Sequence, residues 1–226
     1  MDQEILFLNK NAQQLGITLN ERQLAQFDIY RNELLQWNTK TNLISENSSQ
    51  EIIARHFLDS LTAWQFIDTP NARMIDVGCG AGFPGIPLKI TLPSLELYLL
   101  EVNRKKVSFL KHIIRLLNIT PVHVLHDRVE NIMRTVSWKE NFDILISRAT
   151  FKLPELLPQG EFFLVPGGKI IALKGPDVEE EIKRCSLAKN RLKIPQLIQH
   201  DINAAFWEAP RKIIIGKKQI FSKKTF

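Results

Sequence analysis

The chain has 226 residues, 44% of them hydrophobic, and a formal net charge of +6 at pH 7. This composition allows one sizeable core, and the charge permits a polyanionic partner without requiring one. Cys79 and Cys185 lie far apart with no Cys or His at ligand spacing, so we expect neither a zinc site nor a disulfide framework. The N-terminus lacks a secretion signal, and no apolar run reaches the ~18 residues of a membrane span. We therefore expect a cytoplasmic protein without a membrane segment.

The first 68 residues have helical periodicity. Asn20 and Gln23 stand at the spacing of a capping box, and apolar residues follow at steps of three and four, namely Leu24, Phe27, Tyr30, Leu34 and Trp37. A second helix is predicted from Ser49, with one apolar stripe formed by Ile53, Phe57, Leu61 and Trp64. We interpret both stripes as core-facing. The sequence thus predicts a helical extension, residues 1–68, packed on a catalytic domain, residues 69–226.

From Arg73 onward, short β-branched runs alternate with helical patterns. Strands are expected at RMIDV, ELYLLEV, PVHVLHD, FDILIS and GGKIIALKG. Two further strand candidates, IPQLIQHDI and RKIIIGKKQI, are close enough along the chain to pair antiparallel. Such alternation predicts an α/β fold with βαβ crossovers, a parallel sheet and helices on both of its faces.

The loop after the first of these strands is the most informative stretch. It reads RMIDVGCGAGFPGIP, and Gly80, Gly82 and Gly85 form a literal G-x-G-x-x-G motif. Glu101 follows about twenty residues later, where a carboxylate accepts hydrogen bonds from ribose hydroxyls. A nucleoside-containing cofactor is therefore predicted, and this pattern fits NAD and S-adenosylmethionine equally.

Two residues of the loop separate these cofactors. Pro84 removes a backbone N–H that a pyrophosphate would use, and Asp76 repels phosphate but favours a nearby ammonium or sulfonium. S-adenosylmethionine has both cations and no phosphate. Cys79, with no visible base beside it, is interpreted as a small spacer rather than a nucleophile.

The ends of the next strands supply further candidates. After the third strand, Val129 would offer an apolar face and Glu130 a polar contact to adenine, although Glu130 is equally well explained as a first-turn helix acid. Arg148 and Lys174 end the fourth and fifth strands, where cations bind a carboxylate, a phosphate or a developing charge.

Three polar residues share one turn of the second helix. Arg55 and Asp59 are four residues apart, which by itself favours a surface ion pair, and His56 by itself favours a structural role. At the other end of the chain, the segment GKKQIFSKKTF carries four lysines and no acid. It is interpreted as a solvated tail or a phosphate-contacting one.

Taken together, these motifs resemble the RsmG (GidB) family of bacterial small-subunit rRNA guanine-N7 methyltransferases. The resemblance covers nearly the full length, in family order: LLQWNTKTNLIS, RHFLDSL, IDVGCGAGFPGIPLKI, NRKKVSFLKH, DRVEN, ISRA and ALKG. It implies a Rossmann-like class I methyltransferase fold with a seven-stranded, mostly parallel sheet and an N-terminal helical extension. It also implies methyl transfer from S-adenosyl-L-methionine to N7 of one guanine in 16S rRNA.

The resemblance also implies roles for individual residues. The cofactor site is expected to contain Asp76, Gly78, Gly80, Gly82, Phe83, Glu101, Val129, Glu130 and Arg148. Glu101 stands where many members have aspartate, and Cys79 where serine or threonine is frequent. Arg55, His56 and Asp59 are then expected to help close the helical extension over the cleft. Arg128 and Lys174 are expected to contact rRNA phosphate or the guanine.

Guanine N7 carries an unprotonated lone pair at neutral pH, so positioning should be the main catalytic effect and no general base is required. The candidates for positioning are Arg148, Lys174, Arg55, His56 and Asp59. The expected partner is 16S rRNA, the small ribosomal subunit or an assembly intermediate, and neither DNA nor a membrane. Two alternatives remain open: a nicotinamide-dependent oxidoreductase, and a non-catalytic RNA-binding module with a vestigial cofactor pocket.

Overall fold

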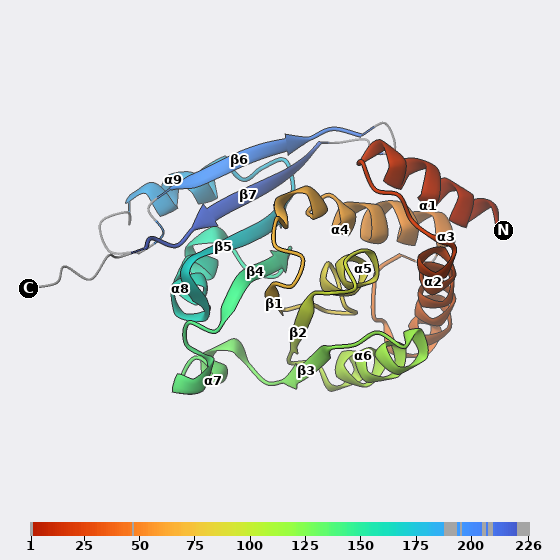
Figure 1. Ribbon diagram of the computed structural model, residues 1–226, viewed down its shortest axis with the longest axis horizontal. Helices are drawn as coiled ribbons and strands as arrows, with labels where there is room; N and C mark the ends of the chain where they lie inside the picture. The colour runs from red at the N-terminus through yellow and green to blue at the C-terminus, as the bar shows by residue number, and fades with distance from the viewer. Residues whose placement is uncertain are drawn as a thin grey trace, which may run out of the picture.

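The structure is a computed structural model that describes residues 2–46, 48–187, 194, 196–204, 207 and 210–220. Its centre is a seven-stranded sheet with the order β3-β2-β1-β4-β5-β7-β6 (Figure 1). The strands are β1 (Arg73–Val77), β2 (Glu96–Glu101), β3 (Val122–His126), β4 (Phe142–Arg148), β5 (Leu164–Lys174), β6 (Leu197–Ile202) and β7 (Arg211–Lys217). Strands β1 to β5 pair in parallel, whereas β7 is antiparallel to β5 and β6. The predicted mostly parallel sheet and its late antiparallel pair are confirmed.

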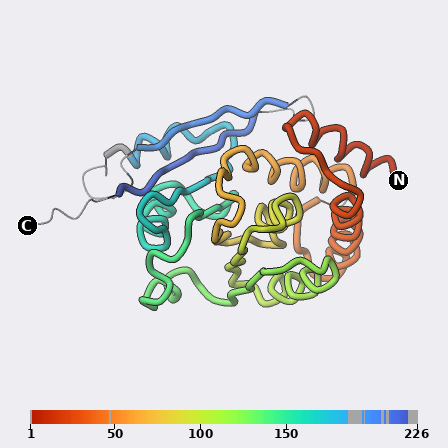
Figure 2. Tube along the Cα trace, in the orientation of Figure 1, coloured from red at the N-terminus to blue at the C-terminus, as the bar shows by residue number. Residues whose placement is uncertain are grey.

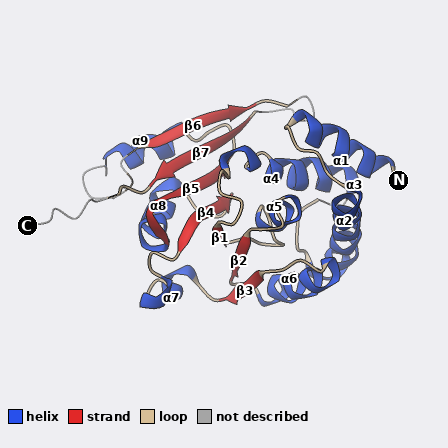
Figure 3. Ribbon diagram, in the orientation of Figure 1, coloured by secondary structure: helices blue, strands red, loops and turns tan. Residues whose placement is uncertain are grey.

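Helices surround this sheet, as Figure 3 shows. They are α1 (Gln3–Gln14), α2 (Glu21–Thr41), α3 (Ser49–Ile52), α4 (Asp59–Leu61), α5 (Gly85–Thr91), α6 (Arg104–Leu117), α7 (Val129–Ile132), α8 (Leu153–Phe163) and α9 (Glu179–Leu187). A π-helix, Ile53–Leu58, joins α3 to α4. None of the described helices is long and apolar enough to cross a bilayer.

Alternate residues of the strands pack into two hydrophobic cores, one on each face of the sheet. In β1, Met74 belongs to the core that contains α5 and α6, and Ile75 belongs to the core that contains α7 and α8. Phe27 of α2 and Phe57 of the π-helix are fully buried in the first of these cores. The N-terminal helices therefore share their core with the sheet, and the division at residue 68 stays a prediction.

The capping box predicted at the start of α2 is present. The Asn20 side chain accepts from the Gln23 N–H and the Gln23 side chain accepts from the Asn20 N–H, each at 2.9 Å. Figure 2 shows the red and orange N-terminal trace around the yellow trace of α5 and the loop before it. The helical extension thus reaches the carboxyl edge of the sheet, where the candidate residues lie.

Two helical details differ from the sequence expectation. The segment from Ser49 does not form one regular α-helix, because its central residues adopt π geometry and its end, Trp64–Phe66, is a 3₁₀ turn. The helix α8 lacks a sequence signal of its own, since Pro158 lies inside it and proline normally interrupts a helix. Packing of Leu153, Leu156 and Phe163 into the second core holds this helix in place.

Candidate functional site

The loop between β1 and α5 is shaped by three glycines with positive φ. These are Gly78 at +71°, Gly80 at +61° and Gly82 at +106°, a region of backbone space that side chains other than glycine rarely adopt. The loop is held by two carboxylates: Gly80 N–H donates to Glu101 Oε2 and Gly85 N–H donates to Asp76 Oδ2, both at 2.8 Å. The two acids predicted to flank the cofactor therefore also fix the backbone of its loop.

Asp76 is an incompletely paired buried acid. Its side chain is fully buried, and its Oδ1 has no hydrogen-bond partner among the described residues. Burial raises the pKa of Asp76 to about 7, although the Gly85 N–H and the charge of Arg148 oppose the rise. A cation brought close to this carboxyl would stabilise its charged form. Its role toward an ammonium or sulfonium stays a prediction.

The geometry around the loop fits the nucleoside part of S-adenosylmethionine. Glu101 ends β2 with one oxygen on Gly80 N–H and the other on Asn103 N–H, at 2.7 Å, and each carboxylate oxygen has a second lone pair that a ribose hydroxyl can use. A Cβ at Gly80 would contact only the end of the Lys106 side chain, with Nζ at 3.8 Å, so no backbone crowds the loop there. Of the residues predicted at the adenine end, Val129 is buried and Glu130 is exposed.

The helical extension presses directly on this loop. Tyr30 Oη of α2 donates to Ala81 O at 2.6 Å, and a Cβ at Gly82 would lie 2.8 Å from that hydroxyl oxygen. The Phe83 ring stacks on Tyr30 and on His56, with centroid distances of 5.4 and 4.7 Å. Phe83 is 3% exposed, so its ring links the extension to the loop instead of offering a free face to a ligand.

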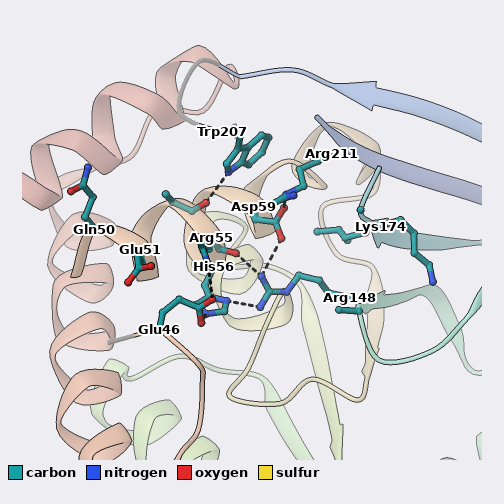
Figure 4. A pocket seen from close by; sticks show the side chains of 14 residues that line it. Glu46, Gln50, Glu51, Arg55, His56, Asp59, Arg148, Lys174, Trp207 and Arg211 are labelled. Atoms are coloured by element: carbon teal, nitrogen blue, oxygen red, sulfur yellow. Dashed lines mark hydrogen bonds and ion pairs between the residues drawn. The ribbon is translucent and has the colours of Figure 1, made fainter. Parts of the chain in front are cut away.

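Arg148 joins the end of β4 to the extension (Figure 4). Its guanidinium lies over the Phe83 ring at 5.1 Å and donates to Arg55 O at 2.7 Å. One Nη atom of Arg148 lies 2.7 Å from His56 Nδ1, and His56 Nε2 lies 2.7 Å from Glu46 Oε2. Because arginine only donates, Nδ1 must accept, and the ring proton sits on Nε2 and points at Glu46.

His56 is therefore a neutral structural link. Burial, followed by the charge of Arg148, lowers the pKa of His56 to about 4. The pKa of Glu46 is lowered despite burial, because His56 and Ser45 donate hydrogen bonds to it. Both ring nitrogens of His56 are engaged at neutral pH, which leaves neither of them free to exchange protons with a substrate.

Asp59 holds two arginines at once. Its Oδ2 accepts from Arg148 at 3.1 Å and its Oδ1 accepts from Arg211 Nε, at the start of β7, at 3.2 Å. The prediction of a surface ion pair between Arg55 and Asp59 is wrong. The π-helix bonds residue i to i+5, so side chains four residues apart no longer align on one face as they do in an α-helix. Instead, an Nη atom of Arg55 lies 3.7 Å from Glu46 Oε1.

A cavity of about 700 Å³ opens beside these residues, at the carboxyl ends of β4 and β5. Figure 4 shows its lining side chains. It is lined by Glu46, Gln50, Glu51, Ala54, Arg55, His56, Asp59, Arg148, Ala149, Leu173, Lys174, Gly175, Trp207 and Arg211. Glu46, Trp207 and Arg211 carry no motif of their own in the sequence, and only folding places them near Arg148.

The remaining basic residues singled out from the sequence differ in burial and in their ion-pair partners. Lys174 is 9% exposed at its side chain, and its ammonium donates to Glu181 and to Phe151 O. Arg128 is exposed and has no ion-pair partner among the described residues. In the basic C-terminal segment, Lys218 is buried and donates to Glu140, which excludes a solvated or phosphate-contacting role for it. Residues 221–226 of that segment lie outside the described residues.

Replacing Gly78 with alanine is expected to distort the cofactor loop. The added Cβ would lie 2.4 Å from Thr150 Cγ2, at a φ of +71°, so the loop and the segment after β4 must separate. We expect S-adenosylhomocysteine affinity to fall at least ~10-fold in isothermal titration. Gly175→Ala is the matched control, because a Cβ there meets nothing within 4 Å. Unchanged affinity in Gly78→Ala would contradict the assignment of this loop.

Comparison with known proteins gives the family. The family model for rRNA small subunit methyltransferase G matches residues 23–205. A ribosomal RNA small subunit methyltransferase G from Syntrophus aciditrophicus is 45% identical over 76% of this chain and 72% of its own length. One from Desulforamulus reducens is 34% identical over 96% of this chain and 91% of its own.

Solved structures support the fold. An O-methyltransferase from Bacillus cereus, in complex with SAH, superposes with a TM-score of 0.60 at 17% identity, over 84% of this chain and 91% of that chain. This likeness confirms the Rossmann-like fold. Together with the family match over most of the sequence, it leads to one conclusion: the chain belongs to the rRNA small subunit methyltransferase G family.

Proposed function

We propose that this protein transfers a methyl group from S-adenosyl-L-methionine to N7 of a specific guanine in 16S rRNA. The observation that carries the proposal is the position of Arg148. It borders the cavity at the carboxyl end of β4 and also covers Phe83 of the glycine loop. A cofactor on the loop and a base in the cavity would therefore lie on either side of one fixed guanidinium.

The work of the chain in this reaction is to position the reactants. S-adenosylmethionine supplies an electrophilic methyl group on its sulfonium sulfur, and the guanine N7 lone pair needs no deprotonation. Consistent with this, His56 is neutral and bonded at both nitrogens. Glu101 and the glycine loop would hold the cofactor, Asp76 would favour its cations, and the Arg148 cluster would orient the base.

The finer parts of the proposal concern partner and location. The substrate would be 16S rRNA, as free RNA, small subunit or assembly intermediate, in the cytoplasm, with no role for DNA or a membrane. A transfer assay with tritiated S-adenosylmethionine tests this on naked 16S rRNA, 30S particles and DNA, followed by mapping of the labelled base. We expect label at guanine N7 in RNA only. RNA binding without label would favour the non-catalytic alternative, and tight NADH binding without S-adenosylhomocysteine binding would favour the oxidoreductase.

A basic surface at the same edge of the sheet supports an RNA partner. Arg104, Lys105 and Arg128 follow β2 and β3, are exposed and have no ion-pair partner in the part of the chain that is described. Cations at the start of α6 also oppose the helix dipole, which disfavours positive charge at a helix N-terminus.

The double substitution Arg104→Glu/Lys105→Glu is expected to separate stability from RNA binding. Acids at the start of α6 favour the helix dipole, so thermal stability should rise slightly. Loss of two phosphate contacts should weaken RNA binding and reduce the slope of log K against log salt by about 2 in filter-binding titrations. Lys139→Glu, an exposed lysine just before β4, is the control and should leave the slope unchanged. An unchanged slope in the double variant would show that Arg104 and Lys105 do not contact RNA phosphates.

A further inference from the structure

The cavity beside Arg148 has the size and walls of a binding site. Its volume of about 700 Å³ lies within the roughly 300–1,000 Å³ range of small-molecule sites. The helical extension supplies one wall through Glu51 and Arg55, and the side chains of Trp207 and Arg211 supply another (Figure 4). The cofactor loop contributes none of the lining residues, so a second ligand can occupy the cavity beside a loop-bound cofactor.

Trp207 is an aromatic ring held in place at the rim of this cavity. Its indole Nε1 donates to Ala54 O of the π-helix at 3.0 Å, and the guanidinium of Arg211 lies 5.5 Å from its ring centre. The side chain is only partly buried. An aromatic ring beside cations is the surface on which unstacked RNA bases stack. The Nε1 bond and the Arg211 guanidinium hold the ring at the rim of the cavity.

The guanidinium of Arg211 retains free donors for a phosphate. Its Nε atom bonds Asp59, and neither of its Nη atoms has a hydrogen-bond partner among the described residues. Arg55, on the facing wall, is 56% exposed at its side chain and 3.7 Å from Glu46. The cavity thus has cations on two sides, as a nucleotide within a longer RNA strand requires.

Glu51 differs from the other acids of the cavity because it lacks a cation. Glu46 lies near His56 and Arg55, and Asp59 holds two arginines. The Glu51 carboxylate accepts one hydroxyl hydrogen bond, from Ser48 at 2.8 Å, and within the described chain no Lys, Arg or His nitrogen lies within 4.0 Å of it. Guanine presents two neighbouring donors, N1–H and the N2 amino group, on the edge opposite N7, and one carboxylate can accept both.

From these placements we infer that the cavity is the pocket for the target guanine, which stacks on Trp207 and donates N1–H and N2–H to Glu51. This inference rests on the proposed function and adds how the base is selected. Recognition through N1 and N2 leaves the N7 edge directed away from Glu51. An adenine would place an acceptor, N1, against the carboxylate and would be rejected.

The test uses the full chain with saturating S-adenosylhomocysteine and two nucleotides, GMP and IMP, which differ only in the N2 amino group. Equilibrium dialysis should show the unmodified protein binding GMP about 10-fold more tightly than IMP. Glu51→Gln should abolish this preference, because an amide cannot accept two hydrogen bonds in the same way. Glu21→Gln, at an exposed residue of α2 outside the cavity, is the matched control and should keep the preference.

Substitution of Trp207 tests the stacking. Trp207→Ala should lower kcat/KM for RNA by about 10- to 100-fold with S-adenosylhomocysteine affinity unchanged, and Trp207→Phe should restore most of it. Trp138→Phe, at a partly buried ring packed against the core on the other face of the sheet, is the control. Equal binding of GMP and IMP, or Trp207→Ala with kcat/KM unchanged, would overturn the pocket. Nucleotide preference without methyl transfer to any RNA would refute the proposed function and retain the pocket.

Discussion

Replacing Asp59 with asparagine is expected to weaken both the fold and the methyl transfer. Asp59 is 7% exposed and bonds Arg148 and Arg211 through separate oxygens. In asparagine one of these oxygens becomes an amide N–H, which faces a guanidinium that can only donate. Removal of one partner from a buried ion pair costs about 3–5 kcal/mol. Urea denaturation should show a loss of this order in the free energy of unfolding.

The kinetic effect should exceed what reduced stability explains. Arg148 would lose its hydrogen bond to Asp59, and with it the link through Asp59 to Arg211 of β7. Its remaining hydrogen bonds, to Arg55 O and His56, lead only to the π-helix. A misplacement of about 1 Å can cost ~10²-fold in rate. We therefore expect kcat/KM for RNA to fall about 100-fold at a temperature where the variant is fully folded, measured by methyl transfer.

Asp68→Asn is the matched control for this prediction. Asp68 also pairs with a cation of the sheet, Lys169 at 2.7 Å, but its side chain is 74% exposed. Exposed ion pairs contribute at most ~1 kcal/mol, so stability and activity should stay near those of the unmodified protein. If Asp59→Asn and Asp68→Asn behave alike, Asp59 does not hold the arginines as described.

The parts of this protein that sequence predicts well are those with local causes. The capping box at Asn20 needs only a partner three residues away, and the strand ending at Val77 is an apolar run before a glycine. The sequence places the glycine loop correctly, because the positive φ angles of this turn require glycine. Residue types and short spacings are therefore enough to predict these individual elements.

The partners within the site could not be predicted, because they come from distant segments. Asp59 meets Arg148 and Arg211 across sequence separations of 89 and 152 residues. The π-helix changes the direction of the side chains around His56, and spacing rules for an α-helix then indicate the wrong pair. The burial of Lys218 could not be predicted for the same reason. A basic C-terminal pattern does not indicate that one lysine is buried beside Glu140, which is distant in sequence.

Replacing Asp76 with asparagine should stabilise the protein at neutral pH and weaken cofactor binding. The pKa of this buried carboxyl is raised from 3.8 to about 7. Between these values the unfolded chain releases the proton and the folded chain retains it, so stability is lost as pH rises from about 4 to 7. The loss approaches about 4 kcal/mol above pH 7. Asparagine keeps an acceptor for the Gly85 N–H and carries no charge, which removes this loss.

The measurement is urea denaturation of both proteins from pH 4 to pH 8, with S-adenosylmethionine titrations at the same values. The stability advantage of Asp76→Asn should grow through this range and level off above pH 7. Asp127→Asn should instead lower the stability, because hydrogen bonds from Asn131 and the Arg128 N–H lower the pKa of Asp127 and so stabilise its charged form in the folded protein. Cofactor affinity of the unmodified protein should rise with pH as Asp76 ionises beside the bound cations, and Asp76→Asn should lack this rise. A stability advantage independent of pH would mean that Asp76 is already ionised in the folded protein at pH 4.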